Sequence, residues 1–193
     1  MALKLITAPA TEPISLNEAK QHCVVDFNND DTLISSLIVA AREYCETYQN
    51  RAYLTQTWEL ILDLWPQIIN LPMSPTQSVS SIKYKDYEGL EKTVEASDYI
   101  VDTDSEPARI IPAHGKTWPM SEPLQKIAGI RIRYVAGYSS AVLVPQKVKQ
   151  AILLLVGHWY NNREALVIGN LSVSKEIEFS VKALLNMQRV FPI

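Results

Sequence analysis

The segment from Val144 to Glu164 constrains the fold more than any other part of the chain. Pro145 suits the first position of a helix, because its missing N–H costs nothing there and its fixed φ is already helical. Apolar residues recur behind it at helical spacing: Val148, Ala151, Ile152, Leu155 and Trp159. The segment therefore predicts a core helix. It ends in aromatic, amide and charged side chains that lack the pattern of a catalytic site.

The first third of the chain predicts two further helices. Ser15 and Glu18 have the spacing of a capping box, in which each side chain accepts a hydrogen bond from the other residue's backbone N–H. A longer helix follows, capped by Asp30 or Asp31, and its apolar residues keep one face over about four turns. Asn50 is expected to end this helix, because asparagine tolerates the left-handed conformation that closes many helices.

The middle of the chain predicts strands, because the apolar period changes to two. One face of the first predicted strand is apolar and consists of Trp58, Leu60, Leu62 and Leu64. Further strands are predicted at residues 68–71, 79–85, 90–95, 98–102, 108–111 and 130–134. Residues 85–89 are typical of a hairpin loop, and residues 112–127 predict a long ordered loop.

The fold class predicted from this order is α+β. The N- and C-terminal thirds, residues 1–53 and 142–193, are expected to form a mainly helical core that ends in a short helix with Val181, Leu184 and Leu185. Residues 54–141 are expected to form an antiparallel β region inserted in the middle. The length of 193 residues fits one core with a sizeable insertion.

Composition excludes several classes of function. With 47% hydrophobic and 20% charged residues, the chain has enough apolar material for a core. Its net charge of -3 argues against a general affinity for nucleic acid, which requires a basic surface. The N-terminus lacks the pattern of a signal peptide. The longest strongly apolar run, Ala151–Val156, is far shorter than the roughly 20 residues that span a bilayer. We expect a soluble protein with no membrane partner.

Side chains that carry catalysis or bind metals are few and scattered. Among the three histidines only His22 has a neighbouring cysteine, and the two cysteines are expected to be reduced. The segment Gly115–Thr117 lacks the earlier glycine of a phosphate-binding loop. The carboxylates from Asp102 to Glu106 lack the glycine and glutamate of a calcium loop. We therefore predict no enzyme, no catalytic residue, no metal site and no cofactor.

The loop of residues 112–127 carries a candidate interface. Its candidate residues are His114, Lys116 and Trp118. Trp118 is the most interface-like of the four tryptophans, because it stands in a loop beside Pro119 and tryptophan is a preferred anchor in protein contacts. The other tryptophans are expected in the core.

Several blocks of sequence, taken together, carry a resemblance. They are Ile14–Lys20, Tyr48–Leu60, Asp98–Asp102, Pro107–Ile110, Trp118-Pro119, Ile130–Tyr138 and the helical segment through Glu164. In these blocks and their order the chain resembles the head–tail connector (adaptor or head-completion) proteins of long-tailed bacteriophages and prophages, in the subgroup with a β insertion.

The resemblance implies a structural role in the virion. Such a protein would form a ring under the portal vertex, join the DNA-filled head to the tail and help to retain the genome. Its partners would be the portal protein, neighbouring copies of itself in a ring matching the portal symmetry, and a tail-side joining protein. Packaged DNA would pass through without specific binding. The protein would be assembled in the host cytoplasm and located at the head–tail interface.

The resemblance also nominates a portal-binding segment at the C-terminus. Its candidate residues are Met187, Gln188, Arg189, Val190, Phe191, Pro192 and Ile193. Arg189 and Phe191 would be its polar and apolar anchors. Two alternatives remain: a tail-completion or baseplate component, and a small enzyme or carbohydrate-binding module built on the β insertion.

Overall fold

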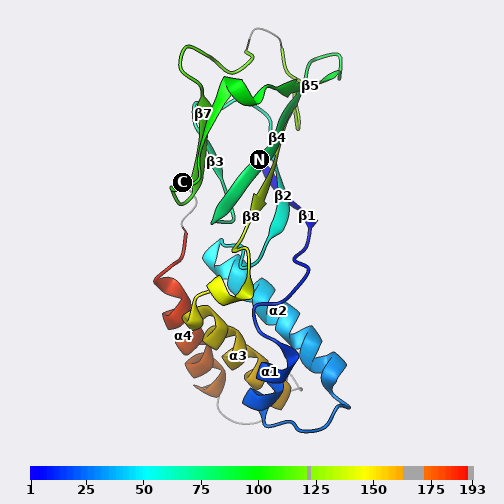
Figure 1. Ribbon diagram of the computed structural model, residues 1–193, viewed down its shortest axis with the longest axis vertical. Helices are drawn as coiled ribbons and strands as arrows, with labels where there is room; N and C mark the ends of the chain where they lie inside the picture. Colours follow the sequence, from blue (N-terminus) through cyan, green and yellow to red (C-terminus); the bar gives the residue numbers. More distant parts are fainter. Residues whose placement is uncertain (121–122, 163–171, 191–193) are drawn as a thin grey trace. The chain divides into compact units, whose positions relative to one another are not determined.

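The computed structural model describes residues 1–120, 123–162 and 172–190. These residues divide into two compact units. The β unit contains residues 1–9 and 55–138, and the helical unit contains residues 10–54 and 139–190 (Figure 1). The α+β fold predicted from the sequence is confirmed, with helices and strands contributing comparable parts of the chain.

The helical unit consists of four α-helices and a short 3-10 helix among the described residues. They are α1 (Leu16–Cys23), α2 (Asp31–Gln49), η2 (Ala141–Leu143), α3 (Gln146–Asn161) and α4 (Ser172–Asn186). The capping box at the start of α1 is present: the Ser15 Oγ accepts from the Glu18 N–H, and the Glu18 carboxylate accepts from the Ser15 N–H. Asn50 ends α2 in the left-handed conformation that the sequence predicts, with φ of 55°.

The core of the helical unit lies where α3 packs against α2 and α1. The buried residues of α3 include Val148, Ala151, Ile152 and Leu155, four of the five residues in the predicted stripe. The fifth, Trp159, is half-buried and meets the ring of Tyr44 edge-on at 6.4 Å. Gly157 lets α1 come close, because a Cβ there would lie 3.1 Å from the His22 ring. These apolar surfaces hold the three helices together.

The β unit contains two antiparallel sheets. The five-stranded sheet has the order β1-β2-β8-β4-β5, and the three-stranded sheet has the order β3-β7-β6. Their strands are β1 (Ala2–Thr7), β2 (Gln56–Leu62), β3 (Ile69–Leu71), β4 (Thr76–Lys85), β5 (Glu91–Val94), β6 (Tyr99–Asp102), β7 (Ala108–Pro112) and β8 (Ile130–Ala136). A short 3-10 helix, η1 (Ala96–Asp98), precedes β6. The predicted hairpin between β4 and β5 is present.

The N-terminal residues differ from the sequence-based expectation. They were expected in the helical region, yet Ala2–Thr7 form β1 and pair antiparallel with β2 at the edge of the larger sheet. All six residues of β1 are exposed, so the strand has no buried face that an alternating pattern would reveal. Main-chain hydrogen bonds to β2 define this strand. In the described part of the chain, no helix is long and apolar enough to cross a membrane.

Candidate functional site

The chain that follows α4 is held against the C-terminal end of α2. The N–H of Val190 donates to the carbonyl oxygen of Gln49 at 2.9 Å, and the side-chain amide of Asn50 donates to the carbonyl oxygen of Val190 at 2.8 Å. The Nε of Arg51 donates to the carbonyl oxygen of Gln188. The left-handed turn at Asn50 positions these donors, since it brings α2 to an end beside the incoming segment.

Tyr48 adds a side-chain contact on the same end of α2. Its hydroxyl donates to the Asn186 Oδ1 at 2.6 Å, where α4 ends. The guanidinium of Arg189 lies over the Tyr48 ring, 4.9 Å from its centroid, which is a cation–π geometry. Arg189 is exposed yet oriented, so its charge is presented at a fixed place.

A buried charged cluster supports this end of α2. The Arg42 guanidinium donates to the Glu12 carboxylate at 2.8 Å and to the Glu46 carboxylate at 2.7 Å. The second oxygen of Glu46 accepts from the N–H of Tyr53 at 2.7 Å, which fixes the chain that leaves the helix. Burial by itself would lower the pKa of Arg42, but the carboxylates of Glu46 and Glu12 outweigh it and raise that pKa.

The predicted portal-binding residues have different surroundings in the structure. Met187 is 81% exposed and Arg189 is exposed, whereas Gln188 is half-buried and Val190 is buried. Phe191, Pro192 and Ile193 lie outside the described residues. The described part of the segment is therefore a docked piece of surface rather than a free tail.

The predicted loop interface is also divided by burial. Trp118 is only 3% exposed, and its ring stacks on that of Trp65 with centroids 4.9 Å apart. It is therefore a packing residue of the β unit, and it offers no exposed anchor. Lys116 is exposed and pairs with Asp98 at 2.9 Å, and His114 is exposed beside it.

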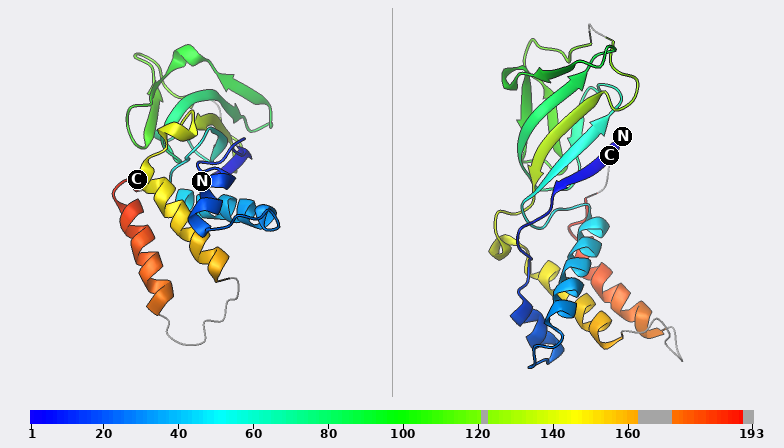
Figure 2. Two further views of the ribbon diagram at one scale, coloured as in Figure 1. Left: turned by 60° about the horizontal axis from the view of Figure 1, so that its bottom comes forward. Right: turned by 90° about the vertical axis from the view of Figure 1, so that its right-hand side faces the viewer.

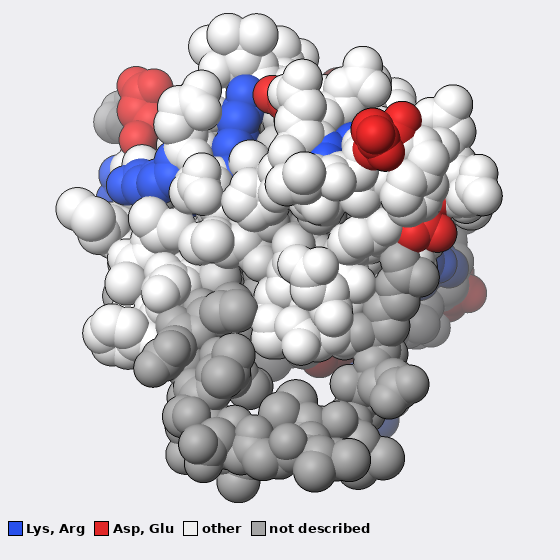
Figure 3. All heavy atoms as spheres, turned by 90° about the horizontal axis from the view of Figure 1, so that it is seen from below, with Lys and Arg blue, Asp and Glu red and all other residues white. Residues whose placement is uncertain are grey.

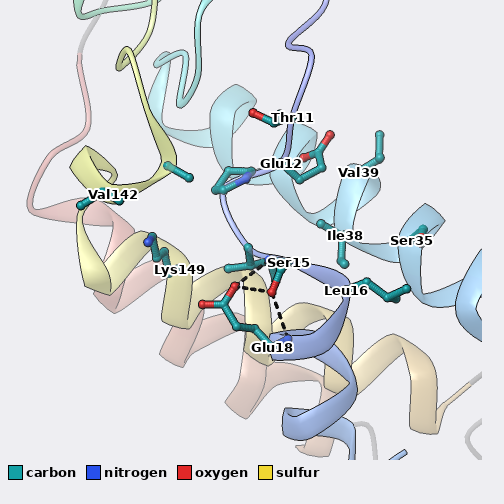
Figure 4. Close-up of a pocket in the computed structure, with 13 residues that line it drawn as sticks. Thr11, Glu12, Ser15, Leu16, Glu18, Ser35, Ile38, Val39, Val142 and Lys149 are labelled. Atoms are coloured by element: carbon teal, nitrogen blue, oxygen red, sulfur yellow. Dashed lines mark hydrogen bonds between the residues drawn. The ribbon is translucent and has the colours of Figure 1, made fainter. Parts of the chain in front are cut away.

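A groove lies in the helical unit between the chain before α1, helix α2 and η2 (Figure 4). Its volume is about 620 Å³. Apolar side chains that include Leu16, Ile38 and Val39 line it, and Val142 stands at its edge. Sequence reasoning missed this groove, because its walls come from four separate segments: the chain leading into α1, helix α2, η2 and Lys149 of α3.

The two cysteine thiols and the Asp102 carboxylate have shifted pKa values. Burial raises the pKa of the Cys45 thiol to about 12 and also raises that of Cys23, so both thiols stay protonated near neutral pH. The Asp102 carboxylate accepts from Ser105 in the following turn and from Arg109 on the paired strand β7, and these bonds lower its pKa. The described residues contain no group of three or more side chains suited to a metal ion.

Figure 3 shows the molecule from below, with basic and acidic side chains scattered among uncharged ones on the described part of this face. At the start of α2, Asp31 pairs with Lys20 of α1 at 2.6 Å. Two exposed apolar residues near this end are Val24 and Phe27.

A family model described as "Phage gp6-like head-tail connector protein" matches residues 13–112 and 121–189. The match therefore includes nearly all of both units. No curated protein matches the sequence of the chain.

Solved structures show the same fold. The neck of an empty gene transfer agent particle, computed with C6 symmetry, contains a chain with a TM-score of 0.81 and 24% identity. The neck of a native particle, computed with C12 symmetry, contains one with a TM-score of 0.79 and 24% identity. A chain of the native virion has a TM-score of 0.79 and 22% identity. Each match covers 100% of this chain and 97% of the other.

Proposed function

The chain belongs to the phage gp6-like head-tail connector family and is a structural head–tail joining protein; on that premise we propose that it forms a ring under the portal vertex. The ring joins the DNA-filled head to the tail and helps to retain the packaged genome. Its neighbours are further copies of itself, the portal protein above and a tail-side joining protein below. The protein is assembled in the host cytoplasm and remains in the virion.

The observation that carries this proposal is the family match over both units of the chain. A match limited to the helices would have left the β unit free for another role. The fold shared with neck chains of gene transfer agent particles, over the full length, supports the same reading. The C6 and C12 symmetries of those particles make a ring of identical subunits the natural assembly.

The portal-binding segment of this proposal is Met187–Ile193. Support comes from its attachment: contacts from Tyr48, Gln49, Asn50 and Arg51 hold the described part on α2, so its exposed side chains have fixed positions. A pre-ordered segment loses less conformational entropy on binding than a free tail does. His114 and Lys116 form a second, smaller candidate contact in the β unit.

We further propose that the protein has no catalytic activity and needs no cofactor. The protonated thiols and the internally bonded Asp102 support this. DNA passes through the ring without specific binding, in keeping with a net charge of -3.

The test is a stop codon at Gln21 in the phage or prophage that encodes the chain, followed by electron microscopy of the induced lysate. Packaged or leaking heads beside separate, finished tails are expected. Supplying the wild-type protein from a plasmid should restore joined particles. Joined particles without complementation would overturn the proposal, and malformed tails on sound heads would assign the protein to tail completion or the baseplate.

A further inference from the structure

Helix α4 carries an apolar stripe that its own unit leaves uncovered. Phe179 is 74% exposed, Met187 is 81% exposed, and exposed Ala183 lies between them at four-residue spacing. The buried residues Val181 and Leu185 lie on the opposite side of the helix. We call Phe179, Ala183 and Met187 the α4 ridge. An exposed apolar stripe of this kind marks an interaction surface.

The groove of Figure 4 is the matching hollow. Its apolar wall includes Leu16 at the start of α1 and Ile38 and Val39 on α2. Val142, in η2, is 84% exposed at the groove edge. A phenylalanine or methionine side chain placed in the groove would contact apolar side chains on several sides. The exposed side chains of the ridge do not have such contacts within their own subunit.

Ridge and groove lie on opposite flanks of the helical unit. Helix α3 contacts α1 and α4, and Figures 1 and 2 show α4 on one side of α3 and α1 on the other. The ridge therefore cannot fill the groove of its own subunit. Two different surfaces on opposite flanks are what a head-to-tail contact requires, and repetition of such a contact closes a ring when the rotation permits.

The charges beside the two surfaces are complementary. From Phe179 to Val190 the charged residues are Lys182 and Arg189, both basic. The groove is lined by the carboxylates of Glu12 and Glu18 and by one basic residue, Lys149. Among the described side chains, the ridge is therefore flanked by basic groups and the groove by a net acidic set, although Glu12 also pairs with Arg42 and Glu18 with Ser15. This difference in sign is compatible with a contact between two copies.

We propose that the α4 ridge of one subunit packs into the groove of the next subunit, and that this contact is the repeating interface of the ring. The inference rests on the proposed function and deepens it by naming the two surfaces that join copies. Met187 belongs to both proposed surfaces: it ends the ridge that contacts a neighbouring copy and begins the segment that contacts the portal.

The test is a cysteine pair, Ala183→Cys and Val142→Cys, in a Cys23→Ser background, with the protein assembled into particles. A short bis-maleimide should convert the subunit into a ladder of covalent multimers on a denaturing gel. Either cysteine alone should give no ladder. The matched control pairs Ala183→Cys with Asn29→Cys, an exposed position outside the groove, and should leave the subunit as a monomer.

The outcomes separate the interface from the connector role. Particles that contain the double variant at the wild-type amount, yet yield no ladder, overturn the interface and leave the connector role standing. An equal ladder from the Asn29 control also overturns the interface. Absence of the wild-type protein from purified particles overturns the connector role itself. If the double variant fails to enter particles, two differently tagged copies, one with Ala183→Cys and one with Val142→Cys, are co-expressed with wild type. A cross-linked dimer that carries both tags supports the interface, and its absence overturns it.

Discussion

The side-chain amide of Asn50 donates a hydrogen bond of 2.8 Å to the carbonyl oxygen of Val190, 140 residues further along the chain. Asn50 thereby has two tasks, since its backbone also adopts the left-handed conformation that ends α2. Glycine performs the second task but not the first. The position therefore separates a conformational contribution to stability from a hydrogen-bonding one.

Replacing Asn50 by alanine should destabilise the protein more than replacing it by glycine. Alanine loses the bond to Val190, worth about 1 kcal/mol, and adds a left-handed penalty of about 1 kcal/mol. Glycine loses only the bond. Urea denaturation of the two variants and wild type measures the difference. Equal stability of the two variants would show that the turn at Asn50 carries no strain.

Truncation should separate portal binding from folding. Ending the chain after Val190 keeps the contacts to Gln49 and Asn50, so the unfolding temperature should stay near that of wild type. Ending it after Asn186 removes those contacts and should lower the unfolding temperature. Both truncations should reduce co-sedimentation with portal-bearing heads that lack the connector. Full binding by the chain ending at Val190 would restrict the portal contact to Met187–Val190.

Removing one carboxylate from the buried cluster should be costly. Glu46→Ala leaves the buried Arg42 guanidinium without one of its carboxylate partners. Breaking a buried ion pair in this way typically lowers the free energy of unfolding by about 3–5 kcal/mol. Glu43 also pairs with Arg42, at 3.6 Å, but its side chain is 62% exposed. Glu43→Ala is therefore the matched control and should cost less than about 1 kcal/mol. Similar losses in chemical denaturation would contradict a structural role for the buried pair.

The buried thiol of Cys45 should make stability depend on alkaline pH. Its pKa rises from an ordinary 9.0 to about 12 on folding, so the folded state holds its proton more tightly than the unfolded state does. This contribution is complete below pH 9 and is lost as the pH rises toward 12. Denaturation midpoints of wild type and Cys45→Ala should therefore converge across that window. Parallel curves would show that the thiol does not titrate with unfolding.

The stacked pair of Trp118 and Trp65 should be a stability determinant of the β unit. Trp118→Ala removes a large buried ring, and such changes cost about 3–5 kcal/mol. Lys116→Ala, two residues away, removes an exposed ion pair to Asp98 and should cost less than about 1 kcal/mol. Tryptophan fluorescence during denaturation reports both. A Trp118→Ala variant with full stability and weak partner binding would instead support the interface role.

Local signals predicted the elements well wherever burial is periodic. The α3 stripe, the capping box at Ser15 and the left-handed end of α2 each follow from side-chain chemistry within a few residues. The strands of the β unit follow from alternation and from turn residues. Strand β1 escaped prediction because its order comes from main-chain pairing with β2, and its side chains are all exposed.

The candidate site was less predictable, because it depends on distant segments. The sequence nominated Arg189 but could not show that Tyr48 holds it. The sequence nominated Trp118 as an interface anchor, because it stands in a proline-rich loop. In the structure its ring is stacked on that of Trp65 and buried. The groove is invisible in sequence for the same reason: residues before α1, on α2 and in η2 meet only after folding.

The division of the chain between the two units also sets the order in which they can be finished during synthesis. Strand β1 emerges first but has no partner until β2 follows the whole of α1 and α2. The β unit is complete once β8 has been made, whereas the helical unit waits for α3 and α4. Its bonds at Val190 form only after α4 has been made. The groove needs α2, η2 and Lys149 of α3, whereas the ridge needs α4, which is made later. A growing chain therefore cannot present both the groove and the ridge until α4 has been made.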